Sequence, residues 1–106
     1  MNNKLIADFL GWTIDNQELN SYRKKEVDFE NNWNDLMKAV EKIEHIDSID
    51  VNILTNGTRI YEWRTGGEVI VDNSADISFE YKIEHVYDAV VKFIKWYNER
   101  RVYQNA

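Results

Sequence analysis

Two glycine-containing turns, Asn56-Gly57 and Gly66-Gly67, constrain this chain more than any other feature of its sequence. Each turn separates short runs in which apolar and polar residues alternate with the period of a β-strand. Runs joined by turns this short form hairpins. The sequence therefore predicts a three-stranded antiparallel meander.

Three-residue loops at 55–57 and 65–67 would make one face of this sheet wholly apolar. Such loops favour glycine at a left-handed position, which Gly57 and Gly67 would fill. A two-residue loop at 56–57 would shift the register by one residue and bring charge onto that face. The predicted pairs are Val51 with Tyr61, Ile49 with Trp63, Trp63 with Val69, and Tyr61 with Val71. The reverse face would carry Asp50, Asn52, Leu54, Ile60, Glu62, Arg64, Glu68, Ile70 and Asp72, with Arg64 and Glu68 forming an ion pair.

Apolar residues at helical spacing predict two helices before the meander in the sequence and one after it. The first covers residues 3 to 10, with Asn2 or Asn3 as cap and Gly11 as stop, and a loop with a strand fragment follows to residue 26. The second follows an Asp28 cap, ends near Ile46 and has the stripe Phe29, Trp33, Leu36, Met37, Val40 and Ile43. The third follows a cap at Asp76 or Ser78, has an Asp88 to Lys92 ion pair, and has the stripe Ile83, Val86, Tyr87, Val90, Ile94 and Tyr97, with Phe93 beside it.

Composition indicates a single α+β domain over residues 1–106, in which two long helices and a short one pack on the sheet. The chain is 43% hydrophobic, which is typical of a globular domain of this length. It contains no cysteine, so disulfides and thiolate metal sites are excluded and a cytoplasmic location is expected. No apolar run approaches the ~18 residues of a membrane span.

The titratable residues do not predict catalysis. His45 and His85 have no His or Cys at metal-ligand spacing, and we expect both to be solvated on the surface. Glu80, Glu84 and Asp88 share a helix face, where a buried pair would suit acid–base chemistry, but solvated carboxylates are the favoured interpretation. No nucleophile motif or phosphate-binding loop is present. We therefore expect no enzymatic activity, no catalytic residue, no metal and no cofactor.

Two small basic clusters have aromatic neighbours, a combination that binds single-stranded nucleic acid. They comprise Tyr22, Arg23, Lys24 and Lys25 in the first, and Trp96, Tyr97, Arg100, Arg101 and Tyr103 in the second. The alternative is a solvated loop and a helix end that balances its own dipole. The net charge of −6 argues against broad phosphate binding and favours a protein partner.

Apolar residues on the reverse face of the predicted sheet suggest where a protein partner would bind. The candidate partner-binding residues are Leu54, Ile60, Glu62, Arg64 and Ile70. An uncovered sheet face or an open strand edge is a common docking surface. The alternative is that the N-terminal helix or the segment from Trp12 to Tyr22 covers this face.

Three segments resemble small proteins of phages and prophages from Bacteroidetes. The segments are Leu5-Ile6-Ala7-Asp8-Phe9-Leu10-Gly11-Trp12, Trp33-Asn34-Asp35-Leu36-Met37 with Val40-Glu41-Lys42-Ile43-Glu44, and Lys82-Ile83-Glu84 with Val86-Tyr87-Asp88-Ala89-Val90-Val91-Lys92-Phe93-Ile94-Lys95-Trp96-Tyr97-Asn98. The resemblance spans nearly the whole chain, although the middle segment varies in such relatives. It implies no catalytic or ligand residues.

The resemblance implies an accessory protein of a mobile element. Small acidic phage proteins often bind and block a host protein, including the nucleases of CRISPR defence. The expected function is thus a non-enzymatic inhibitor, such as an anti-CRISPR protein that binds a CRISPR effector or its ribonucleoprotein. The alternative is a phage accessory protein that binds RNA or DNA through the basic clusters.

Overall fold

The computed structural model describes residues 2–11, 29–64 and 66–105, with side chains as far as residue 100. Over these ranges the chain forms three helices and one antiparallel sheet of three strands. The elements are α1 (Asn3–Leu10), α3 (Trp33–Glu44), β1 (Ile49–Ile53), β2 (Thr58–Glu62), β3 (Glu68–Asp72) and α4 (Lys82–Asn105). The predicted α+β class and the meander in the order β1-β2-β3 are confirmed.

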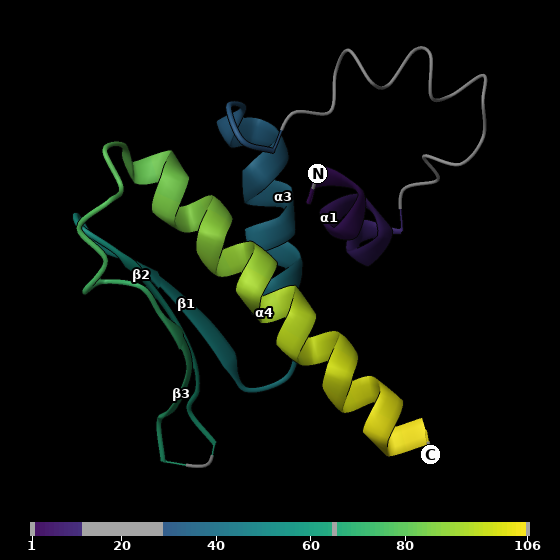
Figure 1. Ribbon diagram of the computed structural model, residues 1–106. Helices are drawn as coiled ribbons and strands as arrows, with labels where there is room; N and C mark the ends of the chain where they lie inside the picture. Colours follow the sequence, from purple (N-terminus) through teal and green to yellow (C-terminus); the bar gives the residue numbers. More distant parts are fainter. Residues whose placement is uncertain (1, 12–28, 65, 106) are drawn as a thin grey trace, which may run out of the picture.

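The elements form three layers (Figure 1). Helix α4 lies across β2 and β3, while α3 lies against β1. Helix α1 packs on α3 and α4, on the side of these helices that faces away from the sheet. Among the described elements, helices therefore cover one face of the sheet only.

Helix α1 is held by a short apolar stripe and a glycine stop. Ile6 and Ala7 are fully buried in the main core. Gly11 has the left-handed backbone predicted for it, with φ of 79°, and its N–H donates to the last turn of the helix. Asn2 occupies the N-cap position, as predicted, but its side chain makes no capping hydrogen bond.

Helix α3 begins later than predicted. Asn32 caps it, because its Oδ1 accepts hydrogen bonds from the backbone N–H groups of Asn34 and Asp35 at 3.0 and 3.3 Å. Phe29 lies in the turn before this cap and is fully buried, although it is not helical. The predicted cap, Asp28, lies outside the described residues.

The register of the first hairpin differs from the prediction by one residue. Val51 pairs with Ile60, and Asp50 pairs with Tyr61. The backbone N–H of Leu54 donates to the carbonyl oxygen of Gly57 at 2.8 Å, so the tight turn centres on residues 55 and 56. A shift of one residue turns each β2 side chain to the other face. The predicted inward orientation of Tyr61 and outward orientation of Ile60 are therefore wrong.

Gly57 does not have the left-handed backbone predicted for it. A Cβ atom on Gly57 would clash with the Cα of Ser74. Glycine is required here because the β1–β2 turn packs directly against the backbone that leaves β3.

The second hairpin contains a β-bulge at Ile70. Tyr61 pairs with Val69, but Ile60 pairs with Val71, which leaves Ile70 as the extra residue. Ile70 and Val71 both contact the core. The predicted left-handed backbone of Gly67 is confirmed, with φ of 86°.

Helix α4 also begins later than predicted. The carboxylate of Glu84 accepts hydrogen bonds from the backbone N–H groups of Glu80 and Tyr81 at 2.6 and 2.8 Å, which caps the helix from within its first turn. The carboxylate of Asp76 instead accepts both bonds from Ser78 in a separate turn, so neither predicted cap is used. The predicted Asp88–Lys92 ion pair is confirmed at 3.0 Å.

Candidate functional site

The predicted partner-binding residues do not form one exposed surface. Ile60 is fully buried, and Ile70 is half-buried against the core. Glu62 and Leu54 are half-buried, and the Oε2 of Glu62 lies 3.5 Å from the hydroxyl of Ser48. Arg64 is exposed, but it pairs with Asp47 at 2.8 Å rather than with Glu68. Because these side chains divide between the two faces, the proposed docking surface must be abandoned.

The register places a different set of large residues on the open face of the sheet. Tyr61 and Val69 pair across β2 and β3. Trp63 lies one residue past the end of β2, where its N–H donates to the carbonyl oxygen of Ser48 at 3.0 Å, so the alternation along the strand returns it to the side of Tyr61. The Trp63 and Val69 side chains are each 54% exposed. We refer to Tyr61, Trp63 and Val69 as the outer sheet patch. Neither α1 nor the other two helices cover it, because all three lie on the opposite face (Figure 1).

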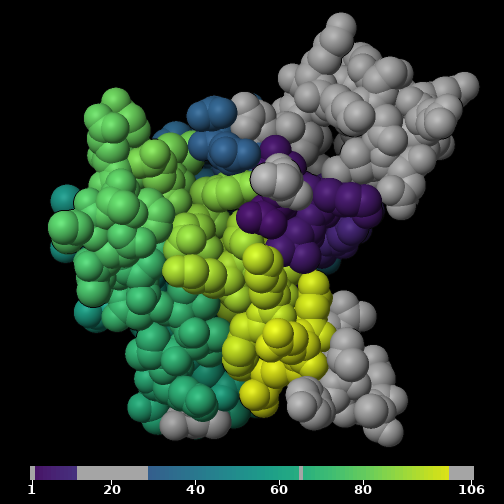
Figure 2. Space-filling view, viewed as in Figure 1, coloured from purple at the N-terminus to yellow at the C-terminus, as the bar shows by residue number. Residues whose placement is uncertain are grey.

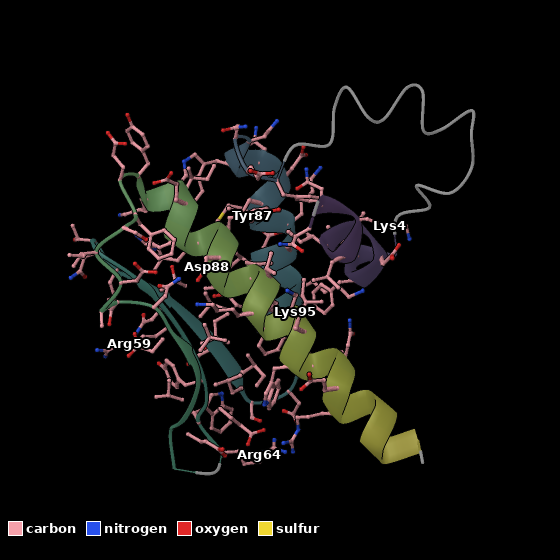
Figure 3. All side chains as sticks on the ribbon, viewed as in Figure 1. Lys4, Arg59, Arg64, Tyr87, Asp88 and Lys95 are labelled. Atoms are coloured by element: carbon pink, nitrogen blue, oxygen red, sulfur yellow. The ribbon has the colours of Figure 1, made fainter. Side chains whose placement is uncertain are left out.

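Ion pairs flank the outer sheet patch toward both ends of the sheet. The Nε of Arg59 lies 3.2 Å from Asp72, and Arg64 lies 2.8 Å from Asp47; Figure 3 shows the two arginines well apart. The guanidinium of Arg64 also lies 5.8 Å from the centre of the Trp63 ring, within the range of a cation–π contact. Hydrogen bonds from Ser74, with the nearby Arg59 guanidinium, hold the pKa of the Asp72 carboxyl below its usual value.

A buried polar cluster joins the sheet to α4. Asn73 accepts a hydrogen bond from the Thr58 N–H at 2.7 Å and donates to the carbonyl oxygen of His85 at 2.8 Å and to Asp88 at 3.0 Å. The Nδ1 atom of His85 lies 2.7 Å from the Thr58 hydroxyl. All polar atoms of the Asn73 side chain are thus satisfied, which a buried amide requires.

His85 is buried, so the prediction of a solvated surface histidine is wrong. Its side chain is 2% exposed, and its Nε2 atom has no hydrogen-bond partner. Burial lowers the pKa of His85 from its ordinary value of 6.5, because the charged ring is poorly solvated there. The neutral ring acts as a packing residue with one polar contact. His45 is exposed, as predicted.

The three carboxylates singled out on the helix face separate into different roles. Glu84 caps α4, Asp88 contacts Asn73 and Lys92, and Glu80 is exposed before the helix begins. Glu84 and Asp88 line a hollow of about 440 Å³ together with Glu30. The described residues contain no group of three His, Cys, Asp or Glu side chains that could hold a metal ion.

A second surface feature lies where α1, the end of α3 and the later turns of α4 meet. Two adjoining hollows of about 230 and 180 Å³ share Ile46 and Tyr97 in their walls. Figure 2 shows the purple surface of α1 against the yellow-green surface of α4. We refer to both hollows together as the Tyr97 cleft. Its aromatic and basic side chains are Phe9, Lys42, His45, Trp96, Tyr97 and Arg100.

The structure assembles part of the second basic cluster and none of the first. The guanidinium of Arg100 lies 4.8 Å from the centre of the Trp96 ring. Tyr22, Arg23, Lys24 and Lys25 lie outside the described residues, as do the side chains of Arg101 and Tyr103. Sequence reasoning missed Phe9, Lys42 and His45, because only the packing of α1 and α3 on α4 brings them beside Tyr97.

None of the described helices combines the length and the apolar character needed to cross a bilayer. No family model, curated protein or solved structure matches this chain.

Proposed function

We propose that this protein is a non-enzymatic, phage-derived interaction protein that binds and blocks a host protein. The resemblance to phage proteins suggests a CRISPR-Cas nuclease or its ribonucleoprotein as the target, acting in the bacterial cytoplasm. The outer sheet patch is the surface that we assign to the partner.

One observation carries this proposal: the aromatic side chain of Trp63 is about half exposed to solvent on the open face of the sheet. Exposing Trp63 at 54% and Val69 at 54% is unfavourable, while helices bury smaller apolar residues on the other face. Tryptophan, tyrosine and arginine are enriched among the residues that dominate binding energies at protein interfaces. The outer sheet patch contains the tryptophan and the tyrosine, and the guanidinium of Arg64 lies against Trp63 beside it.

The net charge of −6 supports a partner with a basic surface. Opposite charge accelerates encounter and suppresses wrong partners. Proteins that handle nucleic acids carry such basic surfaces, so an acidic protein can occupy them in place of the nucleic acid.

The face of the sheet is a better docking surface than the edge of β3. That strand begins with Glu68 and ends with Asp72, and it contains the bulge at Ile70. Charged residues and bulges oppose pairing with a further strand.

The test compares Trp63→Ser with wild type in CRISPR-bearing bacteria challenged with a targeted phage. Wild type should restore plaque formation and bind the purified effector ribonucleoprotein. A hot-spot residue contributes about 2 kcal/mol or more to the binding free energy, so Trp63→Ser should weaken binding to the effector about 30-fold. The bacteria should then resist the targeted phage again.

Ile77→Ser is the matched control, because Ile77 is 97% exposed and lies outside the outer sheet patch. It should act like wild type. Equal activity of Trp63→Ser and wild type would remove the outer sheet patch from the proposal. Failure of wild type to bind or inhibit any effector in a panel of CRISPR types would refute the assignment of the target.

A further inference from the structure

The electrostatics of the Tyr97 cleft favour an anion. Lys42 and Arg100 form no ion pair with any carboxylate in the described part of the chain; each lies over an aromatic ring instead, at 5.2 Å from Phe9 and 4.8 Å from Trp96. Two acids line the second hollow: Asp47 is already paired with Arg64 at 2.8 Å, and the Oε2 atom of Glu62 lies 3.5 Å from the hydroxyl of Ser48. Lys42 and Arg100 therefore keep their charged groups available to a ligand, although the chain as a whole has a net charge of −6.

The aromatic side chains of the cleft are held in place by their packing. The Tyr97 ring meets Phe9 edge-on at 5.9 Å and stacks on Phe93 at 5.9 Å. Trp96 also packs on Phe93, with ring centres 5.6 Å apart. Rings fixed in this way lose little conformational entropy when a ligand stacks on them.

His45 adds a polar group at the rim of the first hollow. Its Nδ1 lies 2.7 Å from the carbonyl oxygen of Glu41. A carbonyl oxygen only accepts hydrogen bonds, so Nδ1 carries a proton. The other nitrogen, Nε2, is then available to accept a hydrogen bond from a ligand group.

The size of the hollows limits the ligand. Volumes of about 230 and 180 Å³ fall below the roughly 300–1,000 Å³ of pockets that enclose whole cofactors or drug-sized molecules. Two small adjoining hollows suit a ligand with two compact parts, one planar and one anionic.

We propose that the Tyr97 cleft binds a nucleotide unit, with its base against Tyr97 or Trp96 and its phosphate beside Lys42 and Arg100. The nucleotide is part of a single strand or a free mononucleotide. Stacking on an aromatic side chain contributes about 1–3 kcal/mol per base without reading sequence. This site is separate from the outer sheet patch and does not depend on the function proposed for it.

The test is fluorescence anisotropy with a labelled oligodeoxythymidylate of about 12 nucleotides, a length within the site sizes of single-strand binders. The double variant Lys42→Ala with Arg100→Ala should bind about tenfold more weakly at about 50 mM salt. Its salt dependence should also fall, because each lost phosphate contact lowers the slope by about 0.7. The matched control, Lys82→Ala with Arg59→Ala, also removes one lysine and one arginine, but both lie outside the cleft. It should bind the oligonucleotide like wild type.

Two competitors separate the sources of the ligand. Adenosine monophosphate should displace the oligonucleotide and inorganic phosphate should not. Binding of adenosine monophosphate without binding of the oligonucleotide assigns the site to free nucleotides. The proposal is overturned if neither probe binds, if the two double variants weaken binding equally, or if phosphate competes as well as adenosine monophosphate.

Discussion

Replacing Ile60 by alanine tests the sheet register, on which the outer sheet patch depends. Ile60 is fully buried on the central strand and contacts Val51 and Val71 across the inner face. The substitution removes the equivalent of three methyl or methylene groups at about 0.8 kcal/mol each, or about 2.4 kcal/mol of transfer free energy. The cavity left behind adds to this cost, so we expect a loss of about 3–4 kcal/mol in the free energy of unfolding.

Thermal and urea unfolding followed by circular dichroism would measure this loss. A domain of this length has a total stability of about 5–15 kcal/mol, so Ile60→Ala should remain folded but with little margin. At about 4–8 °C per kcal/mol, the melting temperature should fall by more than 10 °C. Ile60→Val should lose only about 1 kcal/mol.

Trp63→Ser provides the comparison, because Trp63 would be the buried residue in the alternative register. In the observed register its ring is 54% exposed, so its loss should change stability by only about 0.5 kcal/mol. A large loss for Trp63→Ser together with a near-neutral Ile60→Ala would refute the register.

Three further predictions concern the contacts that the sheet makes with α4 and with the segment after β3. Burial depresses the pKa of His85 below 6.5, so the unfolded chain takes up the proton first as the pH falls, and the free energy of unfolding should be full above about pH 6.5 and decrease below it. In urea titrations at pH 7.5 and 5.5, His85→Gln should remove this pH dependence. An equal pH dependence in the variant and the wild type would contradict the prediction. Asn73→Ala should cost about 2–3 kcal/mol by leaving the buried Thr58 N–H without a partner, while the exposed control Asn52→Ala should be near neutral in the same titration. Gly57→Ala should cost about 1–3 kcal/mol because its Cβ would meet the Ser74 backbone, and a stable variant in thermal unfolding would rule out that close approach.

The sequence predicts the elements well where one pattern dominates. Leu36, Val40 and Ile43 recur at helical spacing, and all three are buried on α3 as that spacing requires. The predicted starts of α3 and α4 differ from the observed starts because several polar residues lie near each start. Only the folded backbone shows which of their side chains accepts hydrogen bonds from the first N–H groups of the helix. Asn32 does so for α3, and its residue type does not separate it from Asp28; α4 is capped instead by Glu84, from within its first turn.

The register could not be predicted because β2 is apolar on both faces. Ile60 alternates with Tyr61 and Trp63, so either choice gives a plausible inner face. The decision comes from the helices, which need compact aliphatic residues beneath them, and from the contact of Gly57 with Ser74. The same limit applies to the Tyr97 cleft, whose walls come from three separate helices and from β1 and β2. Spacing along the chain indicated Trp96 and Arg100 but carried no signal for Lys42 or Phe9.

The side chain of Asn73 has a consequence for how the molecule opens. It bonds at once to the backbone of β2, the backbone of α4 and the carboxylate of Asp88. Lifting β2 and β3 from α4 breaks both bonds that the Asn73 amide donates to α4 and opens the buried bond to the Thr58 N–H to water, so we expect this junction to be among the last parts of the domain to open. The amide proton of Thr58 should therefore be among the slowest to exchange with deuterated solvent.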